Sequence, residues 1–89
     1  MKAWRIEITR AAGRRIIKLD HQAQKSILRF LRERLSAADD PRRWGRVLQG
    51  EKRGLWRYRV GDDRLICAIQ DRSITILVLE LGHRKGVDR

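Results

Sequence analysis

The chain opens with alternating apolar and polar residues, a pattern that predicts a β-strand. The apolar side chains stand at every second position, as Trp4, Ile6 and Ile8. Since successive side chains of a strand point to opposite faces, one face of this strand is expected to be buried.

Two segments with helical spacing follow, and together they predict a helical hairpin. Residues 10–19 carry apolar residues at such a spacing, although Gly13 lowers helix propensity there by about 1 kcal/mol relative to Ala. The second helix is expected to begin after Asp20 as its N-cap residue, and its apolar positions are Ala23, Ile27, Phe30, Leu31 and Leu35. We expect this helix to end near Ala38, because Pro41 disfavours the α conformation at the preceding residue.

Residues 41–54 show little periodicity and predict a basic loop. Three glycines interrupt this segment, whose basic residues are Arg42, Arg43, Arg46, Lys52 and Arg53. The loop also contains Trp44, which could stack on a nucleobase or could pin the loop to the body of the protein.

The remainder of the chain predicts a three-stranded antiparallel meander. Its strands cover residues 55–60, 64–69 and 74–81, and turn-forming residues separate them at 61–63 and 70–73. A strand, two helices and a meander give an α+β fold in which the helices cover one face of the sheet and the other face stays partly open.

Length and composition predict one folded domain spanning residues 1–89. The 89 residues include 22 Lys and Arg against 11 Asp and Glu, which gives a formal net charge of +11 and predicts an acidic partner. A hydrophobic fraction of 42% is too high for a disordered basic tail. The single cysteine, Cys67, excludes an internal disulfide and is most simply a core residue. Apolar runs are too short to cross a membrane and no apolar leader opens the chain, so a cytoplasmic protein is expected.

Arginines of the meander are the main candidate functional residues. Arg57 and Arg59 stand two apart on one strand and so share a face, opposite the apolar side chains that must face the core. Arg64 opens the next strand, and Arg84 follows the last one, so the meander is expected to bring all four together as surface groups. A solvated basic face is the alternative for any single arginine.

Clustered guanidinium groups suit phosphate binding, because they offer paired donors and keep their charge. RNA cleavage without a metal also needs an acid and a base, and His83 is the nearby side chain whose ordinary pKa lies close to neutrality. His21 falls on the surface of the second helix. Acidic pairs at residues 39–40 and 62–63 are typical of turns rather than of a metal site, so neither a metal nor a cofactor is expected.

Three blocks of the chain resemble the RelE branch of the RelE/ParE toxin superfamily. They are LQG at 48–50, LWRYRVGDDRL at 55–65 and LGHRK at 81–85, and the residues KLD at 18–20 also fit. The resemblance implies a toxin of a type II toxin–antitoxin pair that enters the A site of the 30S ribosomal subunit and cuts mRNA there by attack of the 2′-hydroxyl. It further implies a RelB-like antitoxin with an acidic segment, and contact with operator DNA only through the toxin–antitoxin complex.

Family roles carry over onto several positions of this chain. The resemblance places the family's two basic catalytic-site residues of the first meander strand at Arg57 and Arg59, where well-known members have lysines. It also implies a transition-state role for Arg64 and a leaving-group role for Arg84. A family tyrosine falls at Asp88, which could act as a base, weaken the activity or be a detoxifying substitution. Further contacts to RNA are expected from the neighbouring basic loop and the tail, namely Lys52, Arg53, Lys85 and Trp44.

Two other functions remain open at this stage. A ParE-like inhibitor of DNA gyrase would use the same fold without cutting RNA. A nucleic-acid-binding module, which includes a detoxified homologue that binds RNA and antitoxin, would need only the positive charge.

Overall fold

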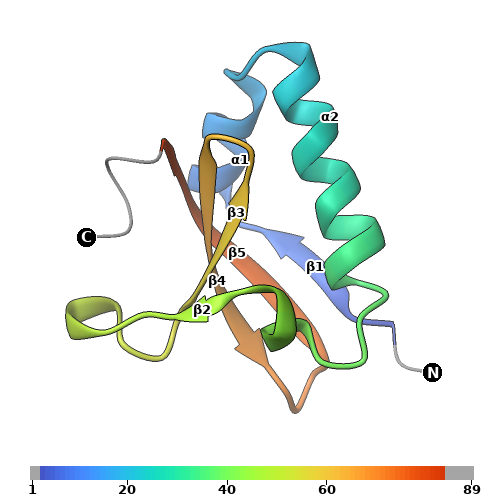
Figure 1. Ribbon diagram of the computed structural model, residues 1–89, viewed down its shortest axis with the longest axis vertical. Coiled ribbons are helices and arrows are strands. Elements are labelled where there is room, and N and C mark those ends of the chain that lie inside the picture. Colours follow the sequence, from blue (N-terminus) through green and yellow to red (C-terminus); the bar gives the residue numbers. More distant parts are fainter. Residues whose placement is uncertain (1–2, 84–89) are drawn as a thin grey trace.

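A computed structural model describes residues 3–83 of the chain as a five-stranded sheet with helices (Figure 1). The strands are β1 (Arg5–Ile8), β2 (Arg46–Val47), β3 (Trp56–Val60), β4 (Asp63–Gln70) and β5 (Thr75–His83). The helices are α1 (Arg10–Ile17), α2 (His21–Arg29), the π-helical turn η1 (Phe30–Leu35) and the 3₁₀ turns η2 (Pro41–Trp44) and η3 (Gly50–Lys52). The predicted α+β fold is confirmed.

Both long helices begin where a side chain caps the first free amide groups. The Thr9 hydroxyl accepts from the Ala12 amide at 3.2 Å, and the Asp20 carboxylate accepts from the Ala23 amide at 2.8 Å. These bonds satisfy donors that have no partner within the helix. Asp20 is therefore the N-cap residue that the sequence predicts.

The end of the second helix differs from the prediction. Figure 1 shows α2 running without a break into η1, which stops at Leu35 rather than near Ala38. Ser36 closes the π turn by donating its amide to Leu31, and its hydroxyl donates to the Trp4 carbonyl at 2.8 Å. The Trp4 amide in turn donates to the Ser36 carbonyl at 2.8 Å. The helical segment thus ends where Ser36 bonds to Trp4, the residue before β1.

The strand order is β1-β5-β4-β3-β2, and the sheet is mixed. β3, β4 and β5 pair antiparallel in sequence order, so the predicted meander is confirmed, and β1 pairs parallel with β5. The loop predicted over residues 41–54 is wrong in part, because it contains η2, η3 and the edge strand β2. A two-residue strand is too short to produce a recognisable alternation.

The core lies between the helices and one face of the sheet. Its buried side chains include Ala12, Ile16, Ile27, Leu31 and Leu35 from the helical segments and Tyr58, Leu65, Cys67, Ile76, Val78 and Leu81 from the strands. Cys67 is a core residue as predicted, and burial raises the pKa of its thiol to about 12. A register shift at Ile66/Cys67 brings Leu81 to the core and places Glu80 opposite Ile66.

Over residues 3–83, the helices are too short and too polar to cross a membrane.

Candidate functional site

Several arginines share the sheet face that points away from the helices. Arg46 lies opposite Arg57 in the β2–β3 ladder, and Arg59 lies opposite Arg64 in the β3–β4 ladder. Directly paired residues of neighbouring strands point to the same face, and Tyr58, between Arg57 and Arg59, is buried on the other. The four arginines define what we call the arginine face.

A cleft of about 460 Å³ opens at the β2–β3 end of the arginine face. Its lining residues are Arg43, Trp44, Gly45, Arg46, Arg57 and Arg59. The structure therefore brings together Arg57, Arg59 and Trp44 of the residues singled out in the sequence. It adds Arg43 and Arg46, which the sequence analysis named as basic loop residues but not as candidate site residues. Four guanidinium groups around one cleft form a strongly cationic site suited to phosphate.

The loop that carries Trp44 is anchored by its neighbours. The Tyr58 hydroxyl donates to the Pro41 carbonyl at 3.0 Å, and both residues are buried. Burial raises the pKa of Tyr58, so its hydroxyl remains a donor. Arg42 forms ion pairs with Asp71 and Asp40, and its hydrogen bond to Asp71 raises the pKa of the guanidinium.

Gly45 joins this loop to β2 at a point of close approach. A Cβ atom there would lie 2.7 Å from Tyr58 Cε1 and 2.8 Å from the Arg57 carbonyl oxygen. Both distances are shorter than real side chains tolerate, so only glycine lets the loop pack this tightly against β3. Arg46 reaches its place opposite Arg57 because of this contact.

Arg64 is buried, with 7% of its surface exposed, and the expectation that it is a surface group is wrong. β4 is an inner strand with neighbours on both sides, Arg59 on β3 and Gly82 on β5 standing opposite Arg64. An inner-strand position is flanked by backbone on both sides; Arg59 adds a side chain on one flank, whereas Gly82 adds none on the other. Arg64 thus differs from Arg59, which is exposed.

Lys52 and Arg53, two of the expected RNA contacts, have different surroundings. The Lys52 ammonium group donates to Glu80, with Nζ 3.2 Å from Oε2. Glu80 pairs with Ile66, in the same row of the sheet as Arg57. It is therefore a carboxylate on the arginine face. Arg53 is exposed on the loop before β3 and is outside the lining of the cleft.

Trp44 is 45% exposed, and the Arg34 guanidinium carbon lies 4.8 Å from the centroid of its ring. This is cation–π contact distance. Arg34 belongs to η1, so the π-helical turn contacts the loop that forms one wall of the cleft.

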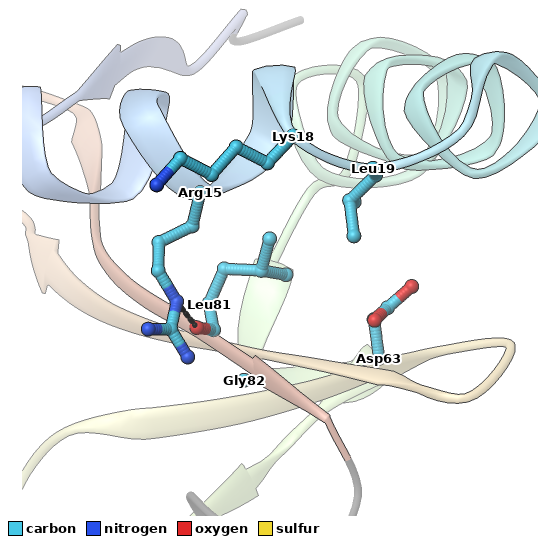
Figure 2. A pocket seen from close by; sticks show the side chains of 6 residues that line it. All are labelled: Arg15, Lys18, Leu19, Asp63, Leu81 and Gly82. Atoms are coloured by element: carbon cyan, nitrogen blue, oxygen red, sulfur yellow. Dashed lines mark hydrogen bonds between the residues drawn. The ribbon is translucent and has the colours of Figure 1, made fainter.

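A second, smaller pocket of about 270 Å³ lies between the end of α1 and the sheet (Figure 2). Figure 2 shows Arg15 and Lys18 on the helical side, and Asp63, Leu81 and Gly82 on the strands. Arg15 Nε donates to the Leu81 carbonyl at 3.0 Å. Asp63, expected in a turn, is the first residue of β4 and is 8% exposed.

The remaining candidates lie at or past the end of the described residues. His83 is the last residue of β5, where its backbone pairs with Asp63. Arg84, Lys85 and Asp88 lie outside the described residues. His21 is exposed at the start of α2. Within residues 3–83, no three His, Cys, Asp or Glu side chains form a group that could hold a metal ion.

Sequence reasoning missed Arg43 and Arg46 as lining residues of the cleft and Glu80 as a member of the arginine face. Arg46 could have been found only through its pairing with Arg57. That pairing depends on β2, a strand of two residues, which is too short to recognise in the sequence. For Glu80 the register shift in the β4–β5 ladder decides the face, and the preceding run of apolar residues, 76–79, gives no alternation to follow.

Comparisons with known proteins agree with this geometry. A family model described as the ParE toxin of the type II toxin–antitoxin system parDE matches residues 6–87. A comparison with curated proteins gave no match.

Three solved structures illustrate the structural similarity. A chain of the RelBE2 toxin–antitoxin complex from Mycobacterium tuberculosis is 30% identical, with a TM-score of 0.85 and 94% of each chain covered. A chain of the archaeal RelE–RelB complex from Pyrococcus horikoshii OT3 is 26% identical, with a TM-score of 0.74, covering 96% of this chain and 99% of that one. The isolated E. coli RelE toxin, 16% identical with a TM-score of 0.72 over 93% of this chain and 86% of its own, shares the fold. The protein described here therefore belongs to the ParE toxin family of type II toxin–antitoxin systems, within the RelE/ParE superfamily.

Proposed function

We propose that this toxin cuts mRNA in the ribosomal A site, by attack of a ribose 2′-hydroxyl on the adjacent phosphate. The observation that carries the proposal is the cleft between β3 and the 41–54 loop, which is lined by Arg43, Arg46, Arg57 and Arg59. A phosphodiester gains negative charge in the transition state, and fixed cationic donors around it stabilise that charge.

The arginines supply charge rather than proton transfer. A guanidinium group stays protonated in proteins, so Arg57 and Arg59 bind and polarise the phosphate and do not act as the base. Arg64, buried beneath the same face, adds a fixed charge to it. The family resemblance gives Arg84 a role at the leaving group, and the candidates for proton transfer are His83, by its side-chain chemistry, and Asp88, which stands at the position of a family tyrosine.

The proposed partners follow from the same charge distribution. An acidic, RelB-like antitoxin segment would neutralise the arginine face, and the net charge of +11 favours such a partner. The similar chains from M. tuberculosis and P. horikoshii come from toxin–antitoxin complexes. Contact with operator DNA would then occur only through the complex, and the free toxin would act on the ribosome.

Primer extension on a translated message, with and without the protein, tests the proposed activity. We expect new 5′ ends within codons positioned in the A site. Arg64→Ala should lower the single-turnover rate on programmed ribosomes by about 10²–10³-fold. Arg64 is buried, so Arg64→Ala could also unfold the protein. Thermal unfolding of Arg64→Ala, compared with Arg64→Lys, which keeps the positive charge, shows whether a lower rate comes from the lost charge or from a lost fold. An uncut message with the unsubstituted protein contradicts the proposal.

Inhibition of DNA gyrase is the second candidate, favoured by the match to the ParE family model. A supercoiling assay with purified gyrase tests it directly. Inhibition of supercoiling together with an uncut message would favour this function. RNA affinity without cleavage and without gyrase inhibition would favour a nucleic-acid-binding module.

A further inference from the structure

Trp44 is an unusually exposed aromatic residue on a firmly held loop. Pro41 and Tyr58 form a buried hydrogen bond beneath the loop, Arg42 is paired with Asp71, and Gly45 packs against β3. These contacts hold the loop without the indole, which is 45% exposed. The indole adds one further contact between the loop and the body of the protein, with Arg34 of η1.

The orientation of the indole is nevertheless restrained. Arg34 reaches over the ring from η1, at 4.8 Å from its centroid, and takes up one of its two faces. A side chain that is already held in place loses less conformational freedom when it binds a ligand. The same indole lines the cleft together with Arg57 and Arg59.

We propose that the free face of Trp44 stacks on a nucleobase of single-stranded RNA whose phosphates lie against Arg57 and Arg59. The ligand of the cleft is thus a nucleotide of single-stranded RNA. That this RNA is mRNA rests on the proposed function. A flat aromatic ring can stack on the base of a nucleotide, and the cationic donors beside it can bind the phosphate. The volume of about 460 Å³ lies within the ~300–1,000 Å³ typical of pockets for small ligands.

An acidic peptide is the competing ligand for such a cleft. The carboxylates of Asp and Glu would bind the arginines, but these side chains carry no aromatic ring to stack on the indole. An affinity that depends on the presence of a nucleobase therefore distinguishes RNA from an acidic peptide. Stacking is also tolerant of sequence, because every base has a flat face.

Binding of two non-cleavable RNA strands to the purified protein tests the proposal. The first is a fluorescently labelled heptamer with 2′-O-methyl riboses, and the second has the same labelled backbone with all of its bases removed. Affinities are measured by anisotropy for the unsubstituted protein, Trp44→Leu and Trp44→Phe. Leu28→Ala is the matched control, because Leu28 is 46% exposed on α2 and outside the cleft.

We expect the unsubstituted protein to bind the complete heptamer more tightly than the abasic one. Trp44→Leu should weaken binding of the complete heptamer about 5- to 150-fold and leave the abasic strand unaffected. Trp44→Phe should retain most of the preference, and Leu28→Ala all of it. Thermal unfolding confirms that each variant is folded.

Three outcomes overturn the proposal: equal affinity of the unsubstituted protein for both strands, an equal loss on both strands in Trp44→Leu, or no loss at all. A poly-glutamate decapeptide that competes fully with the heptamer and is itself weakened by Trp44→Leu would indicate a peptide site instead. Ribosomes are absent from this assay, so its failure is distinguishable from a failure of A-site cleavage.

Discussion

Arg59 lies directly opposite Arg64 across the β3–β4 ladder, so two arginine side chains leave the same face of the sheet from neighbouring strands. Like charges in this position disfavour folding by roughly 0.2–1 kcal/mol. The arrangement is understandable where an anion is to be bound between them, because binding then relieves the repulsion.

Arg59→Gln is expected to raise the free energy of unfolding by up to about 1 kcal/mol while weakening RNA binding. For a domain of this size, that corresponds to a rise of up to about 4–8 °C in Tm. Thermal unfolding at low and high salt measures the effect, which should shrink when salt screens the charges. Arg29→Gln, at an exposed position on α2, is the control. A lower Tm for Arg59→Gln at both salt concentrations would refute the repulsion.

Glu80→Gln is expected to strengthen the binding of single-stranded RNA. Glu80 holds the Lys52 ammonium group at 3.2 Å, and its removal frees one cation beside the arginine face. The slope of log affinity against log salt should steepen by about 0.7, the value for one additional phosphate contact on a single strand. Glu33→Gln removes the same charge from η1, where Glu33 pairs with Arg32, and should change the slope less. Equal slopes for both variants would count against a role of Lys52 in binding.

Two glycine substitutions are expected to change stability in opposite directions. Gly45→Ala forces a Cβ to within 2.8 Å of the Arg57 carbonyl oxygen, and such crowding costs about 1–3 kcal/mol. Gly13→Ala meets only Ile8 Cγ2 at 3.9 Å and lies within α1, so it should stabilise the protein by about 0.5–1 kcal/mol. Urea unfolding measures both. A Gly45→Ala variant as stable as the unsubstituted protein would show that the loop can move away from β3.

Stability is expected to fall at alkaline pH through Cys67. In the unfolded chain a thiol ionises near pH ~8.5, whereas burial raises the pKa of Cys67 in the folded protein to about 12. As the pH rises, the unfolded state loses this proton first. The contribution of Cys67 to the free energy of unfolding is therefore complete below pH ~8.5 and declines from there towards pH 12. Between pH 8 and 10 the loss should be roughly 1–2 kcal/mol. In urea unfolding, Cys67→Ala should remove that part of the decline, and an unchanged decline would exclude Cys67 as its cause.

Local patterns in the sequence were sufficient for most of the architecture. The spacing of apolar residues predicted both helices and the meander, because each element buries one face and repeats with its own period. Asp20 could be recognised as an N-cap from its type and position. The shared face of Arg57 and Arg59 followed from alternation along β3, which holds whatever the neighbouring strands are.

Contacts between distant segments decided the rest. Arg46 joins the arginine face only because Gly45 lets the loop pack on Tyr58, and a two-residue strand has no period of its own. Arg64 is buried because β4 is an inner strand, and strand order is not encoded in local spacing. The sequence by itself therefore determined which segments form helices and strands and the side of β3 on which its arginines lie. Only the tertiary structure decided which residues meet at the cleft, because the pairing register and loop packing depend on residues far apart in the chain.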